Sequence, residues 1–214
     1  MRFAAAALTL LLLPLFALEI VERPILFGPE RIELTREYIR EHYAVSKEDI
    51  SIVPKIVVVH YTAIDDLNRS FEAFYPQRLP GHRDDIARAS ALNVSAHFLV
   101  DRDGTVYRLM EETTMARHVI GLNLFAIGVE NVGGADGRDD LTEAQLEANI
   151  ELVGYLAAKY PTIEYLIGHY EYRNFEKSRL WLERDAGYRT TKKDPGERFM
   201  ERLRKALPGL KSRP

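Results

Sequence analysis

Short apolar runs rich in β-branched residues alternate along the chain with amphipathic segments. The runs at 55–61, 126–132 and 163–169 are nearly continuous, a pattern that predicts strands buried on both faces of a sheet. The shorter runs at 94–100 and 105–110 predict two further strands. Asp103-Gly104 separates them, which indicates a hairpin because this dipeptide tolerates positive φ.

The amphipathic segments predict helices at 29–43, 66–75, 142–160, and from Asp194 to the Pro208-Gly209 pair. Thr142 followed by Gln145 predicts a capping box, and Asp194-Pro195 would place a proline in the first turn of the last helix. Residues 76–85 and 170–193 predict loops. We therefore expect one α/β domain, with a mixed central β-sheet flanked by helices.

The first residues have the pattern of a secretory signal, MRFAAAALTLLLLPLFA. The apolar run from Phe3 to Leu18 has 16 residues, fewer than the roughly 20 that span a bilayer as a helix. We expect cleavage after Ala17; an uncleaved membrane anchor and a buried helix are the alternatives. The predicted organisation is a signal peptide at 1–17, an N-terminal extension at 18–54 and the main domain at 55–207.

The net charge and the cysteine content exclude several kinds of binding partner and metal site. With 29 basic and 32 acidic residues the chain has a net charge of −3, so binding to nucleic acid by electrostatics is not expected. The chain has no cysteine, which excludes disulfides, thiolate metal sites and cysteine nucleophiles. Any metal site must therefore use histidine and carboxylate ligands.

Two of the six histidines stand at the ends of predicted strands. His60 and His169 each follow an apolar run, and in α/β sheets the carboxyl edge is where ligands gather. Two imidazoles and one carboxylate suffice for a catalytic zinc site with an open position. Asp194 is the candidate carboxylate. The alternatives are histidines bonded to the backbone and an aspartate that only caps the following helix.

Six motifs in order carry a family resemblance: VVVHYTA (57–63), VSAHFLVDRDGTVYRL (94–109), RHVIGLN (117–123), AIGVEN (126–131), IGHYEYR (167–173) and KKDPG (192–196). Together they resemble the zinc-dependent N-acetylmuramoyl-L-alanine amidases, whose fold is shared with the peptidoglycan recognition proteins. The resemblance covers residues 55–200 and implies that fold, with 55–207 as the amidase catalytic domain.

Carried over by position, the resemblance implies that His60, His169 and Asp194 bind Zn²⁺. It also implies that Glu130 and Lys192 are catalytic. Glu130 ends an apolar run, where an unpaired carboxylate is costly, and is suited to act as general base and then as proton donor. Lys192 would stabilise negative charge on the carbonyl oxygen. The alternatives are a buried ion pair for Glu130 and a solvated surface position for Lys192.

The other four histidines are assigned from the resemblance or from their place in the sequence. The resemblance implies that His118 contacts substrate, with structural packing as the alternative. His97 lies within a predicted strand and is expected to be a hydrogen-bonded core group, whereas His42 and His82 are expected to be exposed.

One departure from the family concerns the second and third zinc ligands, which compact members keep much closer together. Here 25 positions separate them (194 − 169), and the extra residues are aromatic and basic. Trp181 and Arg179 are therefore expected to contact substrate, by stacking on sugars and by pairing with carboxylates. The alternative is a loop that packs on its own aromatics.

Taken together, the sequence predicts an exported zinc hydrolase, periplasmic or secreted and monomeric, without a membrane span once the signal is removed. It would cleave the amide between the lactyl group of N-acetylmuramic acid and L-alanine in peptidoglycan or muropeptides. One alternative is a peptidoglycan-binding module without catalysis, although such proteins have typically lost a zinc ligand. Another is a zinc peptidase with a different amide substrate.

Overall fold

The computed structural model describes residues 18–81 and 84–214. The predicted signal peptide at 1–17 and His82 lie outside the described residues. Within the described ranges, no helix has the length and apolar character needed to cross a bilayer. The chain forms a sheet with strand order β1-β4-β3-β5-β2-β6. The strands are β1 (Ile20–Glu22), β2 (Ile56–Tyr61), β3 (Phe98–Val100), β4 (Val106–Arg108), β5 (Ala126–Asn131) and β6 (Tyr165–Gly168).

The sheet is mixed, as predicted. β3, β5, β2 and β6 run parallel to one another, and among the six described strands only the β3–β4 pair is antiparallel. β2 lies between β5 and β6, so the side chains from Ile56 to Val59 are fully buried, which explains its continuous β-branched run. The parallel arrangement brings the carboxyl ends of β5, β2 and β6 to one edge.

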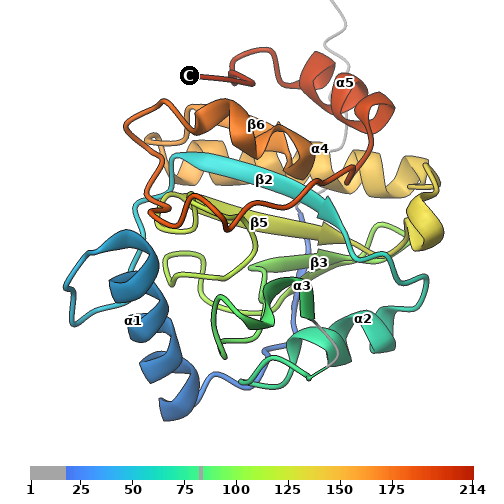
Figure 1. Ribbon diagram of the computed structural model, residues 1–214. Helices are drawn as coiled ribbons and strands as arrows, with labels where there is room; N and C mark the ends of the chain where they lie inside the picture. Colours follow the sequence, from blue (N-terminus) through green and yellow to red (C-terminus); the bar gives the residue numbers. More distant parts are fainter. Residues whose placement is uncertain (1–17, 82–83) are drawn as a thin grey trace, which may run out of the picture.

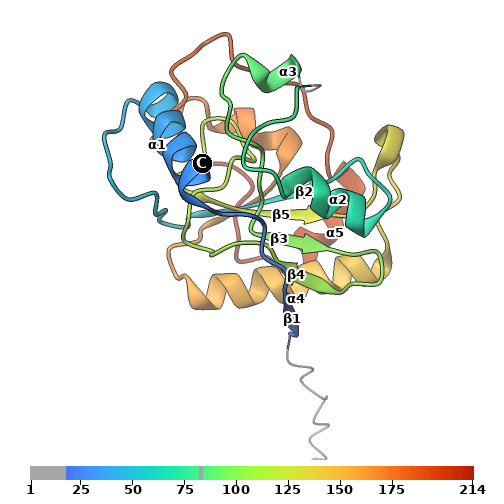
Figure 2. The same cartoon turned by 90° about the horizontal axis from the view of Figure 1, so that it is seen from below.

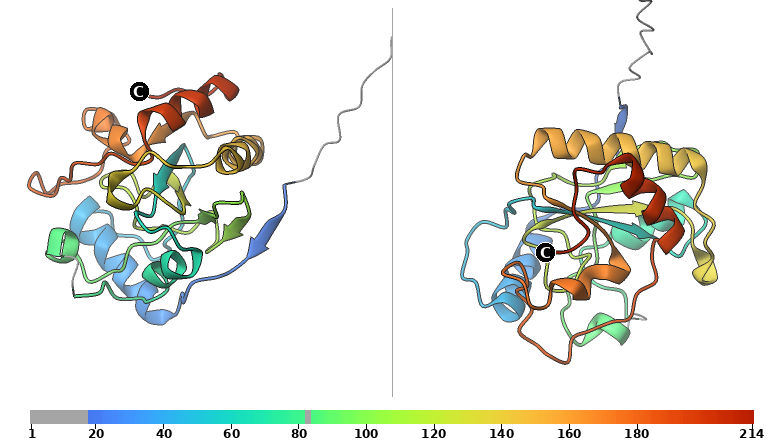
Figure 3. Two further views of the ribbon diagram at one scale, coloured as in Figure 1. Left: turned by 90° about the vertical axis from the view of Figure 1, so that its right-hand side faces the viewer. Right: turned by 90° about the horizontal axis from the view of Figure 1, so that it is seen from above.

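Helices cover both faces of the sheet, as Figures 1 and 3 show. The helices are α1 (Pro29–Tyr43), α2 (Leu67–Phe74), α3 (Asp84–Ala87), α4 (Glu143–Lys159) and α5 (Glu197–Ala206). Seen from below, the strands lie between α4 on one side and α1, α2 and α3 on the other (Figure 2). α5 packs beside α4 and β6. The predicted class, an α/β domain with a flanked mixed sheet, is confirmed.

The predicted capping box of α4 is present: the Thr142 hydroxyl accepts from the Gln145 amide, and the Gln145 side chain accepts from the Thr142 amide. The Gln145 side chain also donates to the carbonyls of Val132 (2.9 Å) and Val100 (3.3 Å), which fixes the start of α4 against the carboxyl ends of β5 and β3. From there Asn149 donates to the Asn131 side chain (2.7 Å), and Asn131 donates to the carbonyl of His60 (3.0 Å). Buried hydrogen bonds from α4 thus hold the ends of β5 and β2.

Two details of the sheet differ from the sequence prediction. β1 was not predicted, because three residues are too short a run to show periodicity, yet it pairs in parallel with β4. β3 begins at Phe98 rather than at Val94. His97 still bonds through its backbone to Gly128 and Leu109, but the Gly128 amide donates to the His97 ring (3.0 Å) instead of to a backbone carbonyl. Further back, the Ser95 amide donates to the Arg117 carbonyl, outside the sheet.

The last helix also begins later than predicted. α5 starts at Glu197, and its N-cap is Gly196, whose φ of +104° favours glycine. Asp194 and Pro195 therefore precede the helix, and the expected proline in the first turn is wrong. The carboxylate of Asp194 does not cap the helix and is directed at the two strand-end histidines instead.

Candidate active site

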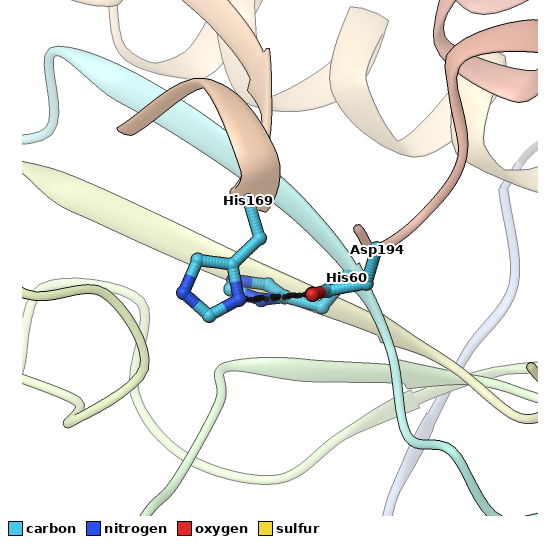
Figure 4. Close-up of side chains that lie close together, drawn as sticks. All are labelled: His60, His169 and Asp194. Carbon is cyan, nitrogen blue, oxygen red and sulfur yellow. Dashed lines mark hydrogen bonds and ion pairs between the residues drawn. The ribbon is translucent and has the colours of Figure 1, made fainter. Parts of the chain in front are cut away.

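Three side chains converge at the carboxyl edge of the sheet. His60 comes from β2, His169 from the start of the 3₁₀ helix η2 (His169–Phe175), and Asp194 from the segment before α5. Figure 4 shows them pointing toward one another. The Nδ1 atoms of the two histidines are 2.9 Å apart, and Oδ2 of Asp194 lies 3.2 Å from His60 Nδ1 and 2.9 Å from His169 Nδ1.

Backbone contacts bring the third member of this cluster to the other two. The amide of Tyr170 donates to the carbonyl of Asp194 (3.2 Å), which joins the segment before α5 to the end of β6. A Cβ at Gly168 would lie 2.6 Å from the Tyr170 ring and 3.0 Å from Pro195. The glycine in the IGH motif therefore allows the two segments to approach closely.

The electrostatics of the cluster favour a neutral imidazole at His60 and an ionised carboxylate at Asp194. Burial and repulsion by His169 lower the pKa of His60 to about 4. Burial opposes ionisation of Asp194, but its contacts with His169 and His60 outweigh burial and lower its pKa well below the usual range. Neutral nitrogens and a carboxylate are the forms in which these residues bind metal.

The cluster fits a divalent metal by the chemistry of its donor atoms. One ligand atom from each residue lies within 4.8 Å of the others, and all three residues are buried. Two imidazole nitrogens and one carboxylate oxygen make up the three-ligand set of a catalytic zinc site. Three electron-pair donors this close together are stabilised by a cation between them.

A pocket of about 320 Å³ opens beside the cluster, and Glu130, Lys192 and His118 are among its lining residues. Glu130 is the register partner of His60, so the two side chains share one face of adjacent strands. Glu130 is 9% exposed. The structure therefore brings both predicted catalytic residues to the pocket that holds the three predicted ligands.

Part of the long segment between His169 and Asp194 forms a wall of this pocket. Tyr188, Thr190 and Lys192 line it, whereas Trp181 and Arg179 are not among the lining residues. The Trp181 ring stacks on Tyr172 at a centroid distance of 6.0 Å and donates to the Glu183 carbonyl (3.1 Å). Arg179 is exposed.

The remaining described histidines are buried. His97 is fully buried and bonded to backbone groups of Thr114 and Gly128, which confirms the expected core position. The expectation that His42 is exposed is wrong: it is 6% exposed and contacts Glu183 at 3.0 Å. Its partner comes from a segment 141 positions away, which local sequence does not reveal. His118 lines the pocket with its ring nitrogens near His60 and a backbone carbonyl.

Asn123, which was not predicted as a site residue, is fully buried and lines the pocket. Its Oδ1 accepts from the backbone amides of His118 (3.0 Å) and Val119 (2.9 Å), and its Nδ2 donates to the hydroxyl of Tyr43 (2.9 Å). Asn123 thereby fixes the turn that carries His118. An asparagine two residues after a glycine is a turn signal that could have indicated this role.

Known proteins share this fold. The amidase LysC from Clostridium intestinale superposes with a TM-score of 0.55 at 22% identity, over 90% of this chain and 99% of that one. A human protein, PGRP-IBETAC in complex with glycosamyl muramyl pentapeptide, gives a TM-score of 0.50 at 17% identity, over 76% of this chain and 88% of the human one. The predicted amidase and peptidoglycan-recognition fold is confirmed.

Sequence similarity identifies the family. The N-acetylmuramoyl-L-alanine amidase family matches residues 51–197, and the chain belongs to it. An endolysin of Klebsiella phage KP32 is 32% identical over 99 residues, which cover 42% of this chain and 65% of the endolysin. The chain spans between about half and two thirds of the length of the curated relatives that it matches.

Proposed function

We propose that this protein is an exported, zinc-dependent amidase that cleaves the bond between the lactyl group of N-acetylmuramic acid and L-alanine. The observation that carries the proposal is the convergence of His60, His169 and Asp194 beside a pocket lined by Glu130 and Lys192, in a chain of the amidase family. The catalytic unit is the domain at 55–207, preceded by the extension at 18–54.

In the proposed reaction, His60, His169 and Asp194 would hold the zinc ion. When bound there, the ion would lower the pKa of the attacking water and polarise the scissile carbonyl. Glu130 accepts the proton of the attacking water and then delivers it to the leaving amine of L-alanine. Lys192 donates a hydrogen bond to the carbonyl oxygen as negative charge develops there. The amide carbon–nitrogen bond breaks, leaving a lactyl carboxylate and a free stem peptide.

The substrate is a peptidoglycan strand or a muropeptide. A human protein of the same fold binds a muramyl peptide, and the matched endolysin belongs to a phage, which supports a substrate of this class. His118, Trp181 and Arg179 are the predicted substrate contacts. Export to the periplasm or medium is supported by the charged and apolar start of the chain, and we propose that the enzyme acts as a monomer. N-terminal sequencing of the exported protein should begin at Leu18.

Digestion of purified sacculi, followed by mass spectrometry, tests the reaction. The expected products are stem peptides with a free L-alanine amino group and glycan with intact lactyl groups. Sedimentation with sacculi without release of peptide would indicate a binding module instead, and cleavage inside the stem peptide would indicate a zinc peptidase. Metal analysis should find about one zinc per chain, the stoichiometry of a three-ligand catalytic site. Activity that persists after chelation, in protein free of zinc, would contradict the metal role.

A further inference from the structure

His118 lies between the predicted ligand His60 and the backbone of β5. Its Nδ1 is 3.0 Å from Nε2 of His60, and its Nε2 is 3.2 Å from the carbonyl oxygen of Ala126. The two imidazole rings meet edge to face, with centroids 5.1 Å apart. Both ring nitrogens of His118 are thus engaged within the protein.

These contacts determine where the hydrogens are. A carbonyl oxygen only accepts, so Nε2 of His118 carries a hydrogen and donates it to Ala126. An imidazole ring that carries its hydrogen on Nε2 has its lone pair on Nδ1, so Nδ1 of His118 is the acceptor that faces His60. Nε2 of His60 must then be the donor across the 3.0 Å contact. This leaves Nδ1 of His60 with a lone pair, directed at His169 and Asp194.

We propose that His118 is a positioning residue that fixes the tautomer and ring orientation of His60, so that Nδ1 is presented to the metal. This inference rests on the proposed zinc function. Histidines that bind a metal through one ring nitrogen generally donate a hydrogen bond from the other. For His60 the acceptor of that bond is His118, which is itself held by the carbonyl of Ala126. This role also accounts for the buried position of His118 at the wall of the pocket.

A glycine in the neighbouring strand makes room for this arrangement. A Cβ at Gly128 would lie 2.8 Å from both Cγ and Nδ1 of His118. Any side chain there would displace the ring that bonds to His60. Gly128 in the AIGVEN motif leaves space for the His118 ring, and Asn123 fixes the turn that carries His118. Both therefore help to place the His118 ring against His60.

The hydrogen bond can be observed directly in the zinc-loaded wild-type protein. With ¹⁵N-labelled histidine, we expect a proton on Nε2 of His60 and a scalar coupling across the bond to Nδ1 of His118. This measurement needs neither substrate nor turnover, so it succeeds or fails independently of the sacculus digestion. A His60 Nε2 without a proton would overturn the proposal.

Variants test the consequence for metal binding, measured as the zinc dissociation constant by competition with a chelator. His118→Phe keeps a ring but removes the acceptor, and zinc affinity should fall by about 10- to 100-fold. Gly128→Ala should weaken binding in the same direction. His118→Asn, whose Oδ1 can accept from His60, should restore much of the loss.

His97→Gln is the matched control for packing, because the His97 ring meets the His118 ring edge to face at 6.0 Å, whereas its own ring nitrogens bond only to backbone groups. Its zinc affinity should stay close to that of the wild type. An unchanged affinity in both His118→Phe and Gly128→Ala would overturn the proposal. So would an equal loss in His97→Gln, since the effect would then come from packing alone.

Discussion

The buried pair His42–Glu183 gives a prediction whose size depends on pH. His42 Nδ1 lies 3.0 Å from both carboxylate oxygens of Glu183, and its Nε2 lies 2.9 Å from the carbonyl of Ala89. All of these partners accept, so both ring nitrogens donate and His42 is an imidazolium. Burial alone would lower the pKa of His42, but the bonds to Glu183 and Ala89 raise it above its usual value. The pair joins α1 to the segment that walls the pocket.

Replacing Glu183 by Gln removes the charge and leaves a buried cation without its partner. Breaking a buried ion pair costs about 3–5 kcal/mol. If His42 loses its proton, no unpaired charge is buried in the variant. The loss of unfolding free energy is then that of one weakened hydrogen bond, about 1 kcal/mol. Because the folded pKa of His42 is raised, its stabilisation is fully present below about pH 6.5 and is lost as pH rises through the folded pKa.

Urea unfolding of wild type and Glu183→Gln at about pH 5.5 and about pH 8.5 measures this difference. The loss of unfolding free energy should be near 3 kcal/mol at the lower pH and near 1 kcal/mol at the higher, about a threefold ratio. Glu164→Gln is the control: its pair with Lys211 is more than half exposed, so the loss should be below about 1 kcal/mol at both pH values. An equal loss for Glu183→Gln at both pH values would refute the assignment of an imidazolium.

The other predictions concern the site. Glu130→Gln should retain zinc while turnover falls by about 10²- to 10⁴-fold, the scale of a positioned acid–base group, and near-normal turnover would remove Glu130 from the mechanism. Lys192→Ala should lower turnover by about 10²-fold or more with zinc content unchanged, as measured by single-turnover kinetics on a muropeptide. His60→Ala should purify without zinc, and a full complement of metal in that variant would contradict its role. Trp181→Ala and Arg179→Ala should mainly raise KM for full muropeptides, and unchanged kinetics on every fragment would make the segment purely structural.

Much of the fold was predictable from sequence because its signals are local. The β-branched run of β2 and the capping box of α4 lie where the patterns predict them. The placement of His60 and His169 at one edge also follows from sequence, since parallel strands share their carboxyl edge. The third predicted ligand, Asp194, was indicated by its motif, although the last helix was expected to begin there and begins at Glu197.

The contacts between distant segments were decided only by the tertiary structure. The local sequence predicts that His42 is an exposed residue near a helix end. In the folded protein, Glu183, which lies 141 positions later, contacts its ring. Nothing in the local sequence shows that both ring nitrogens of His118 have partners, because one partner is on β2 and the other is the first residue of β5. Sequence periodicity specifies which face of an element is buried, since that depends on residues a few positions apart. Which polar groups meet across that buried face depends on strand order and loop path, and these emerge only when the whole chain has packed.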